Sequence, residues 1–201
     1  MVLVALVAAL ASACGGPAAT FDPAGPCDLD GRAAGAYPDL EARLPTELDG
    51  AAPTAVDSGR HCTEAALGSL STHDLDEVRY AGATWDLGGS EGVTSVVFAD
   101  PAGDLPAAWV AQFYELGARA GKKTDNLETS RPVIRANGEQ AWRLDVLNDL
   151  SFQSTVTWQD GPIVRTVLVA TPVGVGASMG AHDGLVLEAV EATLAAAAGP
   201  G

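Results

Sequence analysis

Basic residues are scarce in this 201-residue chain, which has 11 Lys and Arg against 26 Asp and Glu and a formal net charge of −15 at pH 7. So large an acidic excess repels phosphate backbones and anionic lipid headgroups. We therefore exclude nucleic acid as a partner and expect the charge to keep the folded part soluble. Aromatic residues are also few, at 5%, but 47% of the chain is hydrophobic, which excludes wholesale disorder.

Long apolar runs are equally rare. The clearest covers the nine residues 2–10 and is followed by small residues and then by Cys14-Gly15-Gly16. A run of this length fits the central region of a secretory signal, whereas a membrane-spanning helix needs about 20 apolar residues. The pattern resembles the start of bacterial lipoproteins, in which a small or aliphatic run ends in a Cys that is followed by Gly or Ser.

The resemblance implies that residues 1–13 are a signal peptide cleaved before Cys14, and that lipid is attached to Cys14. Two or more acyl chains hold a protein firmly to a membrane. Residues 14–36 are rich in Gly, Ala and Pro, so we expect a flexible tether between the membrane and the domain. The expected location is the extracytoplasmic face of the cell membrane.

Cysteine occurs three times. With Cys14 assigned to lipid, Cys27 and Cys62 remain, and two such residues in an exported chain predict a disulfide. The alternative is a metal site, for which His61 beside Cys62 is the one nearby candidate. Such a site would need two or more further ligands. We therefore favour the disulfide and expect neither a metal nor a cofactor.

Residues 37–201 are expected to form one domain around the segment 131–171, where apolar and polar side chains alternate. Trp142 and Leu144 alternate with Arg143 and Asp145, a period of two that is typical of a half-buried antiparallel sheet. Turns are expected at 137–138, 148–149 and 160–161. Helical spacing predicts a short helix after residue 63, a main helix from 104 to 121 and a last helix over 182–198.

This order of elements predicts an α+β two-layer sandwich, in which an antiparallel sheet of about six strands packs against two or three helices. In element order the globular part resembles small secreted modules of the PsbP and Mog1 type. The polar residues 57–60 are expected to form a loop. The spacing of Trp109, Phe113 and Leu116 predicts that they form the buried stripe of the main helix.

One core between helix and sheet is expected to take up seven side chains: Trp109, Phe113, Trp142, Leu144, Phe152, Val156 and Val167. Strand faces alternate, so a slip of one residue would bring Arg143 and Asp145 inside. This register requires an odd loop of residues 148–150, so that Val146 faces Phe152.

Catalytic motifs are sparse. Residues 176–180 match the nucleophile elbow G-x-S-x-G of α/β-hydrolases, with Ser178 at its centre. Those enzymes use a parallel sheet and place an acid and then a His after the Ser, whereas His182 follows here almost at once. We interpret this segment as a Gly-rich loop. The stretch Asp28-Leu29-Asp30 begins like a calcium loop but lacks the third acid and the Glu at position twelve, so a turn is favoured.

Polar residues on the central strands give the one candidate ligand surface: Arg143, Asp145, Gln153 and Thr155. A solvated sheet face with cross-strand pairs is the alternative. We expect a lipid-anchored, non-enzymatic protein that binds an unknown small molecule or protein. The other hypotheses are a hydrolase that uses Ser178 and a structural or envelope-assembly protein with an exposed apolar patch.

Overall fold

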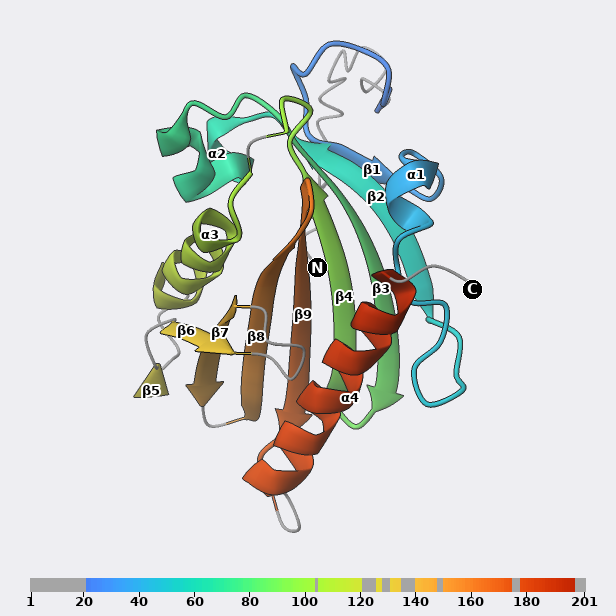
Figure 1. Cartoon of the computed structure of the whole chain (residues 1–201), viewed down its shortest axis with the longest axis vertical. Helices are drawn as coiled ribbons and strands as arrows, with labels where there is room; N and C mark the ends of the chain where they lie inside the picture. The colour runs from blue at the N-terminus through green and yellow to red at the C-terminus, as the bar shows by residue number, and fades with distance from the viewer. Residues whose placement is uncertain are drawn as a thin grey trace, which may run out of the picture.

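The chain folds around an open antiparallel sheet, shown in the computed structural model of Figure 1. The structure describes residues 21–103, 105–120, 126–127, 131–134, 140–147, 150–174 and 178–197. The strands are β1 (Gly31–Ala33), β2 (Ala55–His61), β3 (Val78–Gly88), β4 (Glu91–Ala99), β5 (Asn126–Leu127), β6 (Arg131–Ile134), β7 (Gln140–Leu147), β8 (Ser151–Asp160) and β9 (Ile163–Pro172). The helices are α1 (Pro38–Glu41), α2 (Glu64–Leu67), the 3-10 helix η1 (Gly68–His73), α3 (Ala107–Ala120) and α4 (Met179–Ala197).

The strands are ordered β1-β2-β3-β4-β9-β8-β7-β5, and β6 also pairs with β7. Each pairing is antiparallel, so the expected α+β class with an antiparallel sheet is confirmed. The described sheet has nine strands, more than the six or so expected, because β1 and β5 are short strands without a clear sequence pattern and most of β2 was expected to be a loop. The central strands β4 and β9 join an N-terminal group, β1 to β4, to the meander β7-β8-β9.

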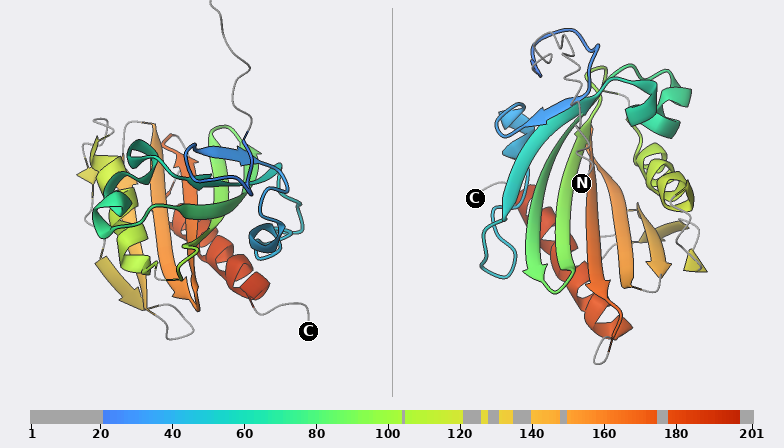
Figure 2. Two further views of the ribbon diagram at one scale, coloured as in Figure 1. Left: turned by 90° about the horizontal axis from the view of Figure 1, so that it is seen from above. Right: turned by 180° about the vertical axis from the view of Figure 1, so that it is seen from behind.

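Helices lie on both faces of this sheet. The two longer helices, α3 and α4, pack against opposite faces of the sheet. In both views of Figure 2 the strands lie between these two helices. Along β4, Val97 belongs to the cluster under α4, whereas Val96 and Phe98 belong to the cluster under α3. The expected single helical layer is therefore wrong, because period-two alternation identifies two faces but does not say which of them a helix covers.

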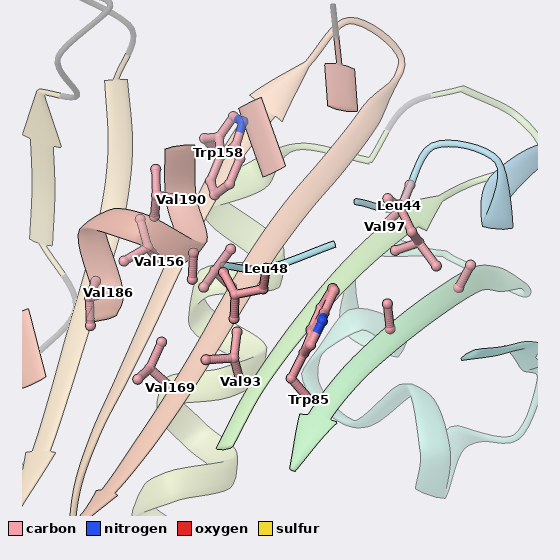
Figure 3. Close-up of a cluster of buried hydrophobic side chains, with 14 of the residues drawn as sticks. Leu44, Leu48, Trp85, Val93, Val97, Val156, Trp158, Val169, Val186 and Val190 are labelled. Carbon is pink, nitrogen blue, oxygen red and sulfur yellow. The ribbon is translucent and has the colours of Figure 1, made fainter. Parts of the chain in front are cut away.

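The core on the α4 side is the larger one (Figure 3). Trp85 and Trp158 are its bulkiest side chains, and both are almost fully buried. Residues from α1 and the loop after it complete this core from the N-terminal side. The side chains labelled in the close-up are Leu44, Leu48, Trp85, Val93, Val97, Val156, Trp158, Val169, Val186 and Val190.

The seven residues expected to share one core are divided between the two faces. Trp109, Phe113 and Trp142 pack against the cluster on the α3 side, while Val156 and Val167 belong to the cluster on the α4 side. The single-core expectation is therefore wrong, because the loop between β7 and β8 sets a different register.

That register pairs Leu147 with Phe152 and Val146 with Gln153. The odd loop that was expected to place Val146 opposite Phe152 is therefore wrong. Residues 148–149, proposed for this turn, lie outside the described part of the chain, as do residues 137–138. The third expected turn is present, since Gly161 follows Asp160 at the end of β8 with φ 59°, a left-handed conformation that favours glycine.

The buried stripe of α3 differs from the expected one. Its buried residues are Ala107, Val110 and Ala111, and Leu116 is 44% exposed. Trp109 and Phe113 lie beside this stripe, where Trp109 stacks on His73 at a centroid distance of 3.9 Å. Both aromatic residues also lie against η1, Trp109 on His73 and Phe113 beside Gly68.

Strand β2 is the main element that the sequence interpretation missed, because residues 57–60 were expected to form a polar loop. Ser58 and Arg60 are buried inside the sheet. The Ser58 hydroxyl accepts from the Tyr37 backbone N–H and donates to Glu41, both at 2.7 Å. The polar pattern is compatible with burial because the Ser58 hydroxyl and both terminal nitrogens of the Arg60 guanidinium have hydrogen-bonding partners, all of them distant in the sequence.

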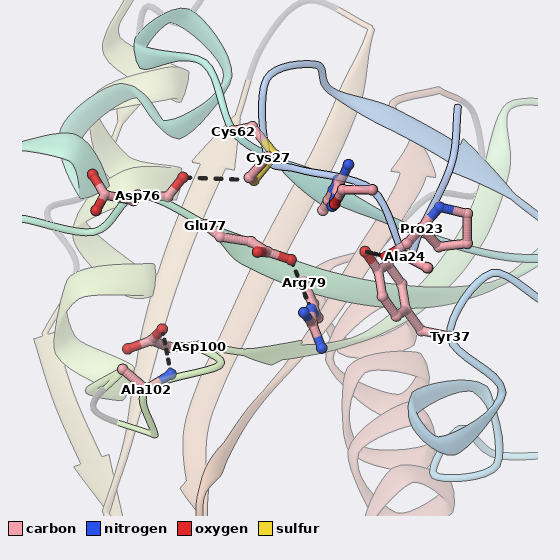
Figure 4. Close-up of polar contacts among 12 residues, drawn as sticks. Pro23, Ala24, Cys27, Tyr37, Cys62, Asp76, Glu77, Arg79, Asp100 and Ala102 are labelled. Carbon is pink, nitrogen blue, oxygen red and sulfur yellow. Dashed lines mark hydrogen bonds and ion pairs between the residues drawn. A yellow bond between two sulfur atoms is a disulfide. The ribbon is translucent and has the colours of Figure 1, made fainter. Parts of the chain in front are cut away.

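Arg60 fixes the segment that precedes β1. Its guanidinium donates to the carbonyl oxygens of Asp22, Gly25 and Pro26, over 2.7–3.1 Å. The expected disulfide is confirmed, since Cys27 is bonded to Cys62 with a Cα–Cα distance of 5.3 Å (Figure 4). Paired structure therefore begins before residue 37, where the domain was expected to start after a tether of residues 14–36.

Among the described helices, none combines the length and the apolar character that crossing a bilayer requires. Cys14 lies outside the described residues.

Candidate ligand-binding surfaces

The four residues proposed as one ligand surface lie on two faces of the sheet. Asp145 pairs with Ser154, so both point to the α4 side, and Arg143 shares their side. Thr155 and Gln153 have the opposite parity and point to the α3 side. The expectation of one shared polar face is therefore wrong, for the same reason that the single core is wrong. Each pair nevertheless lies beside a cavity.

Gln153 and Thr155 line an open groove on the α3 side, with a volume of about 440 Å³. We call it the threonine groove. Cross-strand pairing places Thr84 beside Thr94, Thr94 beside Leu168, and Leu168 beside Thr155, in one row across four strands. A second row contains Asp86, Gly92, Ala170 and Gln153.

The threonine groove exists because the helices cover only part of the α3 side. Described helices α2, η1 and α3 lie toward the other end, and Figure 2 (right) shows the strands of this end without a described helix over them. Thr84, Thr94 and Leu168 are accordingly only half-buried. The Thr84 and Thr94 hydroxyls are 3.2 Å apart and hydrogen-bonded to each other. Their remaining hydrogen-bonding capacity faces the groove.

The lining of the threonine groove is polar and acidic. Its described lining residues include the carboxylates of Asp86 and Glu91 and no Lys or Arg. Such a lining offers hydroxyl, amide and carboxylate groups to a ligand, above an apolar floor at Leu168. Polar ligands that are neutral or positively charged therefore match this surface, and anionic ligands do not.

Arg143 and Asp145 belong to a polar network between the sheet and the first turn of α4. Arg143 Nε donates to Asp145 Oδ1 at 2.8 Å, and the Ser154 hydroxyl donates to the same oxygen at 2.5 Å. The Arg143 guanidinium also forms an ion pair with Asp183 of α4. His182 completes the network, with Nε2 2.8 Å from Ser154 Oγ and Nδ1 2.9 Å from Thr171 Oγ1.

The proton positions in this network follow from the number of donors. The single Ser154 hydroxyl proton goes to Asp145, because an ionised carboxylate only accepts. His182 Nε2 must then carry a proton and donate to Ser154 Oγ. In a neutral imidazole Nδ1 then accepts from the Thr171 hydroxyl. Burial lowers the pKa of His182, although nearby Asp183 raises it in part, which agrees with the neutral form.

This arrangement differs from a nucleophilic triad. In a triad the imidazole accepts the serine proton and the carboxylate holds the other ring nitrogen. Here the carboxylate of Asp145 accepts from Ser154, and a threonine binds the other nitrogen. Ser178 is used differently again, since its Oγ accepts from the Ala181 N–H at 3.1 Å and caps α4.

A cavity of about 220 Å³ opens beside the network, among residues of β7, β8 and the start of α4. In Figure 1 the start of α4 lies at the lower end of the molecule. We call it the α4 cavity. Its lining residues are Asp145, Val146, Leu147, Phe152, Gln153, Ser154, Met179 and His182. We call the end at the buried Ser154 and His182 its base, and the end at the more exposed, apolar Leu147, Phe152 and Met179 its mouth.

The other residues singled out in the sequence have structural contacts. His61 stacks on Tyr80 at a centroid distance of 4.7 Å. Asp30 accepts from the N–H groups of Cys62 and Thr63. Burial raises the pKa of Asp30, but these hydrogen bonds outweigh it and lower the pKa overall. Within the described residues, no three His, Cys, Asp or Glu side chains are grouped so that they could hold a metal ion.

Sequence reasoning missed Ser154 and His182 as members of a site. Each of them occupies an apolar stripe: Ser154 lies between Phe152 and Val156, and His182 is four residues before Val186. A polar side chain in such a position must find a partner inside the protein. The sequence therefore signals that Ser154 and His182 each need a buried partner. It does not show that they are partners of each other, because that requires knowing that this face of β8 packs against this face of α4.

Comparison of the sequence with models of protein families and with curated proteins finds no match.

Proposed function

We propose that this protein is a lipid-anchored, extracytoplasmic binding module without enzymatic activity, and that it takes a polar ligand in the threonine groove. The observation that carries the proposal is the uncovered end of the sheet, where two cross-strand rows present hydroxyl, amide and carboxylate groups. A sheet face of this kind is normally covered by a helix or by a partner. The relation to modules of the PsbP and Mog1 type is also a proposal, which rests on element order.

The anchor and the groove are compatible in their positions. The first described residues, from Phe21, lie beside β1 at the upper end of the molecule in Figure 1. The groove includes the β3–β4 hairpin, at the opposite end of the sheet. Lipid on Cys14 would therefore leave the groove directed away from the attachment end and accessible to a ligand.

Lipidation is tested on the full chain, expressed in a bacterial host that processes lipoproteins. Mass spectrometry of the N-terminal peptide is expected to show an acylated Cys14, and the protein is expected in the membrane fraction. The Cys14→Ser variant should lose both properties. A soluble mature protein that begins at another residue would contradict the anchor without bearing on the groove.

Ligand binding is tested by NMR titration of the exported chain carrying Cys14→Ser. The probes are blocked tetrapeptides of serine, lysine and glutamate. The serine and lysine peptides are expected to shift resonances of β3, β4, β8 and β9, whereas the glutamate peptide is not, because Asp86 and Glu91 repel it.

Matched variants separate the groove from general charge effects. Thr155→Arg should abolish the shifts by filling the groove, while Thr46→Arg, with the same change at an exposed position of the loop after α1, should leave them intact. Equal shifts in the two variants, or no shifts with any of the three peptides, would refute binding in the groove.

A further inference from the structure

We infer that the α4 cavity is a second binding site, which takes a small ligand with a protonated amine attached to an apolar body. The inference rests on other groups than the threonine groove: Asp145 and Ser154 point to the α4 side of the sheet, whereas Thr155 and Leu168 point to the α3 side. The two cavities are neighbours, since Gln153 and Ser154 line both.

The base of the α4 cavity holds an acceptor with unused capacity. Both hydrogen bonds of Asp145, from Arg143 and Ser154, go to Oδ1. Within the described chain Oδ2 has no partner, and Asp145 lines the cavity. The neighbouring groups are fixed, since Ser154 is 2% and His182 1% exposed. An N–H donor that enters the cavity therefore meets a carboxylate oxygen held in place by a rigid network.

Charge around the α4 cavity favours a cation. Asp145 and Asp183 are both paired with the single guanidinium of Arg143. Glu91 adds a third carboxylate whose field reaches His182. Since His182 is neutral, the full charges of these groups sum to −2. The N-terminus of α4 opposes them with about half a positive charge, which is too little to reverse the sign.

The mouth of the α4 cavity is apolar. Leu147, Phe152 and Met179 line it, and Met179 is 46% exposed. Leu150 and Val173 are exposed nearby, and their backbones are joined by a hydrogen bond of 3.0 Å. A ligand that places its amine at the base would therefore bury its carbon atoms at this mouth. The volume of about 220 Å³ is below the range of about 300–1,000 Å³ for typical ligand pockets, so the ligand is small.

The test is an NMR titration at pH 7 of the exported chain carrying Cys14→Ser, with three probes of similar size. These are 2-phenylethylamine, which is protonated, 2-phenylethanol, which is neutral, and phenylacetate, which is anionic. The amine is expected to bind most tightly and phenylacetate least, and the shifts should centre on Asp145, Ser154 and His182. Equal affinity for amine and alcohol would overturn the role of charge, and shifts elsewhere would overturn the site.

Two pairs of variants make the test specific. Asp145→Asn should weaken amine binding about tenfold or more, the value of a charge-assisted hydrogen bond. Asp183→Asn removes the other partner of Arg143 without altering the cavity lining, and should have a much smaller effect. A similar loss in both variants would show that Arg143 pairing, and not contact with the ligand, controls binding, and would overturn the proposal.

The second pair avoids the buried network in case Asp145→Asn unfolds the protein, which its thermal transition would reveal. Met179 is exposed, so Met179→Lys and Met179→Gln should both fold. Met179→Lys should weaken amine binding by repulsion, whereas Met179→Gln should retain most of it. Unchanged binding in Met179→Lys would exclude the α4 cavity as the site.

Discussion

Replacing Gly59 by Ala should destabilise the protein, because β1 pairs with β2 at this residue without room for a side chain. A Cβ at Gly59 would lie 2.2 Å from the Gly31 carbonyl oxygen and 2.8 Å from the Tyr80 hydroxyl. The first contact is with backbone, so the β1 strand must move. Overpacking costs about 1–3 kcal/mol. Movement of β1 also strains the hydrogen bonds of Arg60, each worth about 1.5–3 kcal/mol. We expect a loss of about 2–4 kcal/mol.

A matched control lies in the neighbouring strand. A Cβ at Gly82 of β3 would meet only the Ser95 carbonyl oxygen, at 3.9 Å, which is an ordinary contact. Gly82→Ala should therefore be neutral or stabilising by about 0.4–1 kcal/mol, since Ala restricts the unfolded chain. Urea denaturation of both variants under oxidising conditions measures the difference. If Gly59→Ala stays within about 0.5 kcal/mol of the parent protein, the close packing of β1 on β2 is incorrect.

Three further changes have defined outcomes in the same denaturation assay. Trp158→Ala should lower the free energy of unfolding by about 3–5 kcal/mol, because Trp158 is fully buried. Trp142→Ala should lower it by only about 1–2 kcal/mol, because Trp142 is half-buried. The reverse order would contradict the register of β7 and β8. Replacing Cys27 and Cys62 by Ser should cost about 3–4 kcal/mol, as the bond closes a separation of 35 residues, and an unchanged midpoint would contradict it. Burial lowers the folded-state pKa of His182 below 6.5, so in this pH range the unfolded state binds more protons than the folded state. Stability should therefore fall as the pH drops from 6.5 through the lowered pKa. His182→Asn should reduce this pH dependence.

The strands that are apolar on one or both faces could be predicted from the sequence. Around Val78 apolar residues alternate with charged ones, and 96–98 is an apolar run after a Gly-rich turn; this pattern alone indicates a hairpin with a central second strand, which is how β3 and β4 lie in the sheet. The short helix expected after residue 63 is also present as α2, and it begins at a Thr, a residue type favoured as a cap, whose Oγ1 accepts from the Ala66 N–H at 3.2 Å. These features depend on residues close together in the chain, which is why local patterns suffice for them.

Strand β2 could not be predicted in this way. Ser58 and Arg60 look solvent-exposed in the sequence, and their burial depends on acceptors and donors up to 38 residues away. The candidate site failed for a related reason. Arg143 and Thr155 lie on the same face of the sheet or on opposite faces, depending on whether the loop between β7 and β8 has an odd or an even number of residues. Apolar side chains on both faces of these strands are compatible with either loop length, so the sequence does not decide between them.

The Cys27–Cys62 bond also determines how the domain would respond to force. A pull on the chain before Phe21 first loads the bonds between Arg60 and the carbonyls of residues 22–26, and then reaches Cys27. From there the disulfide carries the load directly to Cys62, so that β1, α1 and β2 lie on a slack loop. A protein held at its N-terminal side could thus be stretched at its attachment without unzipping this edge of the sheet.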